Sequence, residues 1–239
     1  MSALARISRL ARFIDGRHLV SQESRRRPNA TKRAEVNRSP SGANDIDCPM
    51  HIELTSILHQ FDTVQARVHR LADNLTETRW AERADPARWS VAECVAHLNL
   101  TGRAYLPLLR EALEEASSRD EPPPARYRRD PLGWMLSLAM GPVPRIGRFR
   151  LGAVRTIPEF VPERGLPRAQ LVAEFDRIQE EQAGLVREAN GRPINRVWVT
   201  SPFDQRLRYN LYSTFVILPK HQRRHVVQAE RVWQMCSDL

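Results

Sequence analysis

The sequence predicts an all-α protein of four long helices, with a long insertion between the second and third helices and a disordered basic tail at the N-terminus. Apolar residues recur at steps of three and four from Met50 onward, which is the period of an amphipathic helix. This periodicity stops over residues 118–166 and then resumes. Hydrophobic residues make up 41% of the chain and charged residues 27%, as is typical of a folded globular protein.

The first 49 residues differ in composition from the rest of the chain. They hold 10 Lys and Arg against 5 Asp and Glu, and they lack the apolar surface needed to offset the chain entropy lost on folding. A disordered basic tail is the main interpretation. Two alternatives stay open: an Arg-rich targeting segment with an amphipathic start, or a native chain that begins at Met50. Residues 50–239 are expected to form one domain.

The charge of that domain is mild. Residues 50–239 carry 27 basic and 23 acidic residues, although the whole chain has a formal net charge of +9. The positive excess of the domain is small, and its basic residues show no pattern of interspersed stacking aromatic residues. Both features argue against nucleic-acid binding. No apolar run approaches the ~18 residues of a membrane span. Cys48, Cys94 and Cys236 are sparse, odd in number and far apart, which indicates a reducing compartment and a cytoplasmic protein.

Residues 51–75 are expected to form the first helix, because their apolar residues fall on one face. Residues 76–89 are expected to be a connector in which Trp80 and Trp89 fold back onto the core. The apolar face of the helix consists of Leu54, Ile57, Leu58, Phe61, Val64, Val68, Leu71 and Leu75.

The second helix is expected to begin after Ser90. Ser90 and Glu93 have the spacing of a capping box, in which the Ser90 hydroxyl accepts from the Glu93 N–H and the Glu93 carboxylate accepts from the Ser90 N–H. Apolar residues then continue at helical spacing to Leu113. His97 borders this face, where a lone histidine is more often a hydrogen-bonded core residue than a ligand. Pro107 is expected to kink the second half of the helix.

The insertion, residues 118–166, is rich in arginine and contains a short apolar segment at residues 132–140 that predicts two helical turns. Two interpretations stay open. The insertion is either a cover over a pocket, with arginines for an anionic ligand or surface, or a solvated excursion from the domain. Over residues 126–155, Asp130 is the one acidic residue among seven arginines: Arg126, Arg128, Arg129, Arg145, Arg148, Arg150 and Arg155.

The third helix is expected to follow Pro167, which suits a first helical turn, and to end near the stop signal Asn190-Gly191. Residues 192–208 are expected to form another connector, with a short extended piece at residues 197–199.

The last helix is expected over residues 207–235. Its apolar line continues through His221 and His225, which lie four residues apart and therefore on one face. Burying two imidazoles is costly unless their nitrogens are bonded, and a shared metal ion satisfies both. Pro219 is expected to bend this helix or to mark the start of a new helical segment. The whole line consists of Leu211, Thr214, Leu218, His221, His225, Gln228 and Val232.

Two blocks of this sequence resemble the DinB/YfiT-like metalloprotein superfamily. Residues 89–98, WSVAECVAHL, are similar to the start of that family's second helix, which ends in its first metal histidine. Residues 221–230, HQRRHVVQAE, are similar to its last-helix His-x-x-x-His motif. The blocks occur in the family's order, and the similarity covers residues 51–239 while leaving residues 1–49 unexplained.

The resemblance implies a four-helix bundle, often dimeric, in which three histidines bind one divalent metal ion. The ligands it assigns are His97, His221 and His225. Neutral imidazoles suit Zn, Ni or Fe, and three protein ligands leave an open coordination position for water or substrate. Glu93, one turn before His97, is a candidate to orient that ring, and capping its own helix is the alternative role.

The main functional hypothesis is a metal-dependent enzyme, a thiol S-transferase or a hydrolase, acting on a small molecule such as a low-molecular-weight thiol. The sequence identifies no catalytic side chain beyond the metal ligands. The alternative is a non-catalytic metal-binding protein that acts in stress or through interactions, because a fold by itself does not define an activity.

Overall fold

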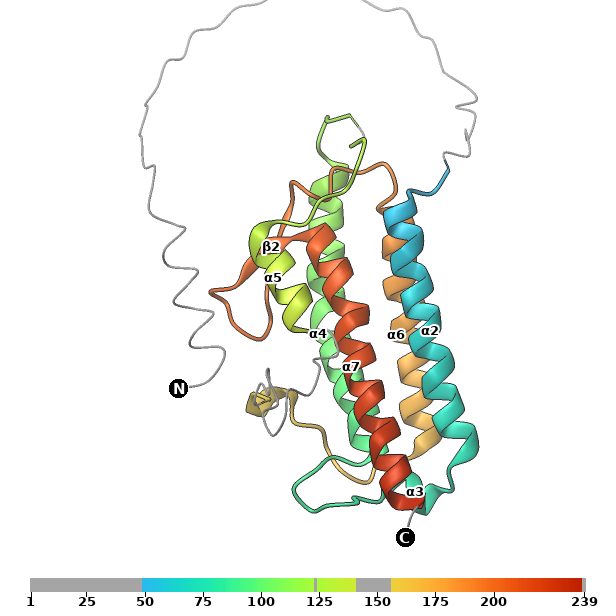
Figure 1. Cartoon of the computed structure of the whole chain (residues 1–239). Helices are drawn as coiled ribbons and strands as arrows, with labels where there is room; N and C mark the ends of the chain where they lie inside the picture. The colour runs from blue at the N-terminus through green and yellow to red at the C-terminus, as the bar shows by residue number, and fades with distance from the viewer. Residues whose placement is uncertain (1–48, 123, 141–155, 238–239) are drawn as a thin grey trace, which may run out of the picture.

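Four long helices form the body of the protein in a computed structural model that describes residues 49–122, 124–140 and 156–237 (Figure 1). They are α2 (Ile52–Asn74), α4 (Val91–Ser117), α6 (Arg168–Glu188) and α7 (Leu211–Ser237). Both α2 and α4 pack against α6 and α7, which places α2 diagonally opposite α4. The predicted all-α class is therefore confirmed, whereas the predicted N-terminal tail lies outside the described residues.

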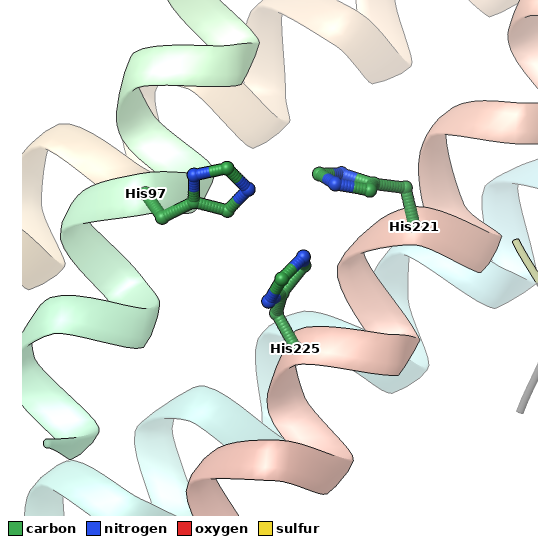
Figure 2. Close-up of side chains that lie close together, drawn as sticks. All are labelled: His97, His221 and His225. Carbon is green, nitrogen blue, oxygen red and sulfur yellow. The ribbon is translucent and has the colours of Figure 1, made fainter. Parts of the chain in front are cut away.

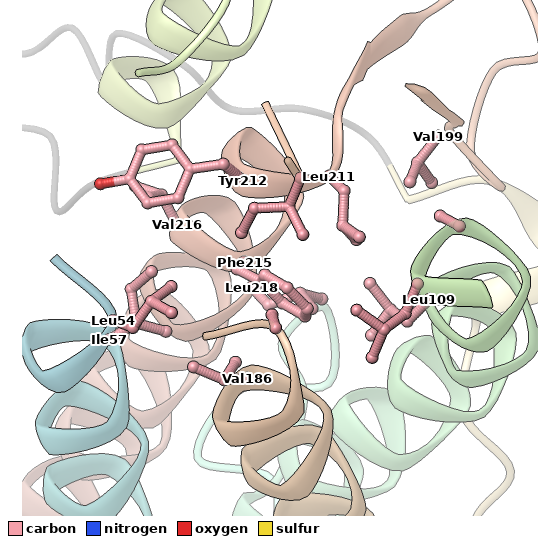
Figure 3. Close-up of a cluster of buried hydrophobic side chains, with 14 of the residues drawn as sticks. Leu54, Ile57, Leu109, Val186, Val199, Leu211, Tyr212, Phe215, Val216 and Leu218 are labelled. Carbon is pink, nitrogen blue, oxygen red and sulfur yellow. The ribbon is translucent and has the colours of Figure 1, made fainter. Parts of the chain in front are cut away.

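Two apolar clusters fill the bundle, one toward each end. The first gathers side chains from all four long helices, among them Leu54, Leu109, Val186 and Phe215 (Figure 3). The second gathers side chains such as Val68 and Leu98 together with the later turns of α7. On α7 the first cluster ends at Leu218 and the second begins at Val226, so the two predicted histidines of α7 lie where the clusters meet. Along the described residues, no helix combines the length and apolar character needed to cross a membrane.

The start of α4 is fixed by the predicted capping box. The Glu93 N–H donates to the Ser90 hydroxyl at 3.1 Å, and the Ser90 N–H donates to the Glu93 carboxylate at 2.8 Å. The preceding connector is not wholly irregular as predicted, because α3 (Glu77–Ala81) forms within it. The Thr76 side chain caps that short helix, and Trp80 within it is 1% exposed, as expected for a tryptophan that folds back onto the core.

The insertion packs onto the bundle where the structure describes it. It contains α5 (Pro131–Ala139) and the 3-10 helix η1 (Pro158–Phe160), so the two predicted helical turns are present. The Asp130 carboxylate anchors α5 to the start of α7, because it accepts from the Gly133 N–H, the Asn210 N–H and the Ser213 hydroxyl. Since Phe160 is also buried, the interpretation as a solvated excursion is wrong for these parts.

The last helix begins later than predicted. β1 (Trp198–Thr200) pairs with β2 (Arg208–Asn210) in an antiparallel hairpin, which takes up residues that the pattern had assigned to the helix. The Asn210 side chain then accepts from the Ser213 N–H at 2.7 Å and caps α7. Past that cap, α7 runs without interruption through Pro219, so the prediction of a new segment at this proline is wrong.

The third predicted helix needs one smaller correction. Pro167 is the N-cap of α6 and not a residue of its first turn. The helix ends at Glu188, and Gly191 just beyond it has a φ of +76°, a backbone conformation that glycine adopts without strain.

Candidate metal centre

Three histidines from two helices converge in the bundle. His97 extends from α4, and His221 and His225 extend from successive turns of α7 toward it (Figure 2). One ring nitrogen from each residue lies within 4.8 Å of the others. The structure thus brings together the three residues that the family resemblance assigned. Their role as ligands stays a prediction.

Local helical structure produces this arrangement. Because His221 and His225 are four residues apart, their rings occupy the same face of α7, with centroids 4.7 Å apart. The His97 ring comes from the facing helix, and its centroid lies 4.4 Å from that of His225 and 5.4 Å from that of His221. Three imidazoles at these separations can donate lone pairs to one small cation.

The surroundings favour neutral rings. Burial lowers the pKa of His97, and burial followed by repulsion from His97 and Arg224 lowers the pKa of His221 to about 3. The pKa of His225 falls well below its ordinary value, chiefly through burial and then through the neighbouring charges of the cluster. Metal ligation needs the unprotonated ring, and the lowered pKa values keep the three rings in that form.

A hydrogen bond fixes the orientation of His97. Its Nδ1 lies 2.8 Å from the Phe160 carbonyl oxygen, so the neutral ring donates from Nδ1 and keeps its Nε2 lone pair available. The orienting group is therefore a backbone carbonyl of the insertion. The prediction that Glu93 orients this ring is wrong, because both Glu93 oxygens are engaged by Arg83 and the Ser90 N–H.

An unpartnered atom shows that these residues fit a metal ion. His225 Nδ1 is buried and has no hydrogen-bond partner among the described residues. A buried polar nitrogen without a partner costs free energy, and a cation in the cluster that is coordinated by this nitrogen removes that cost. The donor set of neutral imidazoles without carboxylates suits Zn, Ni or Fe better than Mg or Ca.

Aromatic side chains that the sequence did not assign to the site line the cluster. The Trp89 ring lies 4.9 Å from the His97 ring and 5.9 Å from the His225 ring, centroid to centroid. Phe203, in the β1–β2 loop, lies 6.0 Å from His221 and 4.5 Å from Phe160. Trp89 could have been found from its place just before the helix that carries His97. Phe160 lies in the short 3-10 helix η1 and Phe203 in a loop, and neither segment carries such a signal.

The fold and the three converging neutral imidazoles place the protein in the class of helical bundles with a candidate site for one metal ion. A model of the DinB superfamily matches residues 60–229, and the chain belongs to that superfamily. Comparisons with curated proteins and with solved structures gave no match.

Proposed function

We propose that this protein is a metal-dependent enzyme that binds one divalent ion through His97, His221 and His225 and acts as a thiol S-transferase or a hydrolase. The observation that carries the proposal is the convergence of three neutral imidazole nitrogens within 4.8 Å. When bound, a divalent ion with three protein ligands supplies an open position and lowers the pKa of a thiol or water that binds there.

The surrounding residues support this chemistry. Phe160, through its carbonyl, holds His97 in the tautomer that ligation needs. Trp89 and Phe203 place apolar faces beside the rings, which reduces the access of bulk water and strengthens electrostatic interactions in the site. A thiol co-substrate also agrees with the reducing, cytoplasmic location expected from the cysteine content.

Elemental analysis of the purified full chain tests the site. We expect about one equivalent of Zn, Ni or Fe per chain, and a loss of that metal when His97, His221 and His225 are all changed to Ala. The matched control is His59→Ala, which removes an exposed histidine of α2 far along the chain from the cluster. Unchanged metal content in the triple variant would exclude this ligand set.

A second experiment separates an enzyme from a metal-stabilised, non-catalytic bundle. The metal-loaded protein is incubated with low-molecular-weight thiols and an electrophile, or with hydrolysable esters and amides. The enzyme proposal expects turnover that disappears with a chelator and returns with metal. If the chelator changes only the melting temperature, and no thiol or ester is consumed, the alternative of a non-catalytic metal-binding protein is correct.

A further inference from the structure

Half-buried cations gather beside the histidine cluster, where α5 meets α7. Lys220 directly precedes His221, and its ammonium donates to the Ser137 carbonyl at 3.3 Å. Arg129 donates to the Ser137 hydroxyl at 2.5 Å. Arg224 donates to the Ala139 carbonyl at 3.3 Å. Because Arg224 follows Lys220 by four residues and His221 by three, it lies between them on the surface of α7.

The described residues leave Lys220 and Arg129 without a neutralising carboxylate. Neither forms an ion pair in the parts of the chain that the structure describes. The nearest acidic residue in sequence is Asp130, whose carboxylate is turned inward and accepts from two backbone N–H groups and the Ser213 hydroxyl. Both side chains bond to the same residue of α5, Lys220 to the carbonyl and Arg129 to the hydroxyl of Ser137, so the two cations lie close together.

Two cations held this close repel each other, and the arrangement gains stability when an anion lies between them. The side chains of Lys220 and Arg129 also have N–H donors that these hydrogen bonds do not use. Lysine offers three N–H donors and arginine five, whereas the hydrogen bonds described here use one from each. The carbonyls at the end of α5 offset part of the positive charge, but they do not take up these remaining donors.

We propose that Lys220 and Arg129, with Arg224 between Lys220 and the histidines, form a subsite for an oxyanion. The group bound is a carboxylate or phosphate of the molecule that reacts at the histidine cluster, and this assignment of its chemistry rests on the proposed function. The subsite lies on the insertion side of α7, so it selects for small molecules that carry an anionic group a short distance from the reacting atom.

Binding of inorganic phosphate and of acetate to the metal-loaded full chain, measured by calorimetry at low salt, tests the subsite. Lys220→Gln and Arg129→Gln should each weaken binding about tenfold, as expected for the loss of one charge-assisted hydrogen bond. Lys220→Arg should restore it. Arg223→Gln removes the same charge from an exposed position on α7 and should change affinity less than about twofold.

Several outcomes decide the matter. Equal losses of anion affinity in Arg223→Gln and Lys220→Gln would show only diffuse electrostatic attraction and would overturn the subsite. Unchanged anion affinity in Lys220→Gln, with an unchanged melting temperature, would also overturn it. A preference for phosphate or acetate identifies which oxyanion the subsite takes. The triple histidine variant separates the two proposals: phosphate binding that persists there, and still depends on Lys220, supports the subsite even if the metal site proves wrong.

Discussion

The histidine cluster should make the metal-free protein sensitive to mild acid. The perturbation is the change His221→Gln, which keeps a polar side chain of similar size and removes one titrating ring. In the folded protein the pKa of His221 is about 3, against an ordinary value of 6.5, chiefly because of burial and then because His97 and Arg224 repel its proton. The folded state therefore resists a proton that the unfolded chain accepts.

The direction in which stability changes with pH follows from this difference in pKa between the folded and unfolded states. Because the folded pKa is depressed, the contribution to stability is fully present above the unfolded pKa and is lost as the pH falls below it. Between pH 8 and pH 5, one such histidine lowers the free energy of unfolding by about 2 kcal/mol, at a limiting slope of about 1.4 kcal/mol per pH unit. His97 and His225 act in the same direction, since burial lowers the pKa of each.

Urea denaturation in the presence of a chelator, at several pH values from 8 to 5, measures this effect. Wild type should lose stability faster than His221→Gln as the pH falls, with a difference that grows to about 2 kcal/mol at pH 5. The control His59→Gln, at an exposed position of α2, should follow wild type. Parallel loss in wild type and His221→Gln would refute the account of a buried, neutral ring.

Three further predictions concern the supporting structure. Glu93→Gln should lower the free energy of unfolding by about 1–3 kcal/mol in a denaturant titration, because it weakens a buried charged pair and a helix cap, yet leave metal content unchanged; a loss of metal would return Glu93 to a ligand-orienting role. Gly102→Ala should cost about 1–3 kcal/mol in thermal unfolding, because its Cβ would lie 2.4 Å from an α6 side chain, whereas Gly184→Ala meets nothing within 4 Å and should be neutral or stabilising; equal effects would contradict this packing. Phe160→Ala should loosen the carbonyl that orients His97 and weaken metal affinity about tenfold in a chelator competition, and unchanged affinity would show that the insertion does not position that ring.

Helix positions were predictable because burial imposes a period of 3.6 residues. The stripe from Leu54 to Leu71 is buried as the pattern predicts, and the capping box at Ser90 formed with both of its hydrogen bonds. The start of α7 was not predictable from the same pattern. Leu207 lies four residues before Leu211, so the helical period extends backward across residues 208–210, which pair as a strand instead.

The histidine cluster shows the same division between local and long-range information. The spacing of His221 and His225 predicts two rings on one face from helix geometry alone. The approach of His97 required the family resemblance, because no local rule relates residues on different helices. The Phe160 carbonyl could not be predicted by either route, since a backbone group in a short segment of the insertion imposes no requirement on residue type.

The insertion contacts both sides of the histidine cluster. On the α4 side, the Phe160 carbonyl bonds to His97, and on the α7 side, Lys220 and Arg224 bond to the last carbonyls of α5. Imidazoles in a bundle can supply the same metal chemistry whatever lies around them, so they do not determine which molecule reacts. We expect that choice to depend on the insertion, which bonds to His97 and gathers cations beside His221. Differences in substrate among bundles of this kind should therefore follow the insertion and its contacts, while the histidines stay the same.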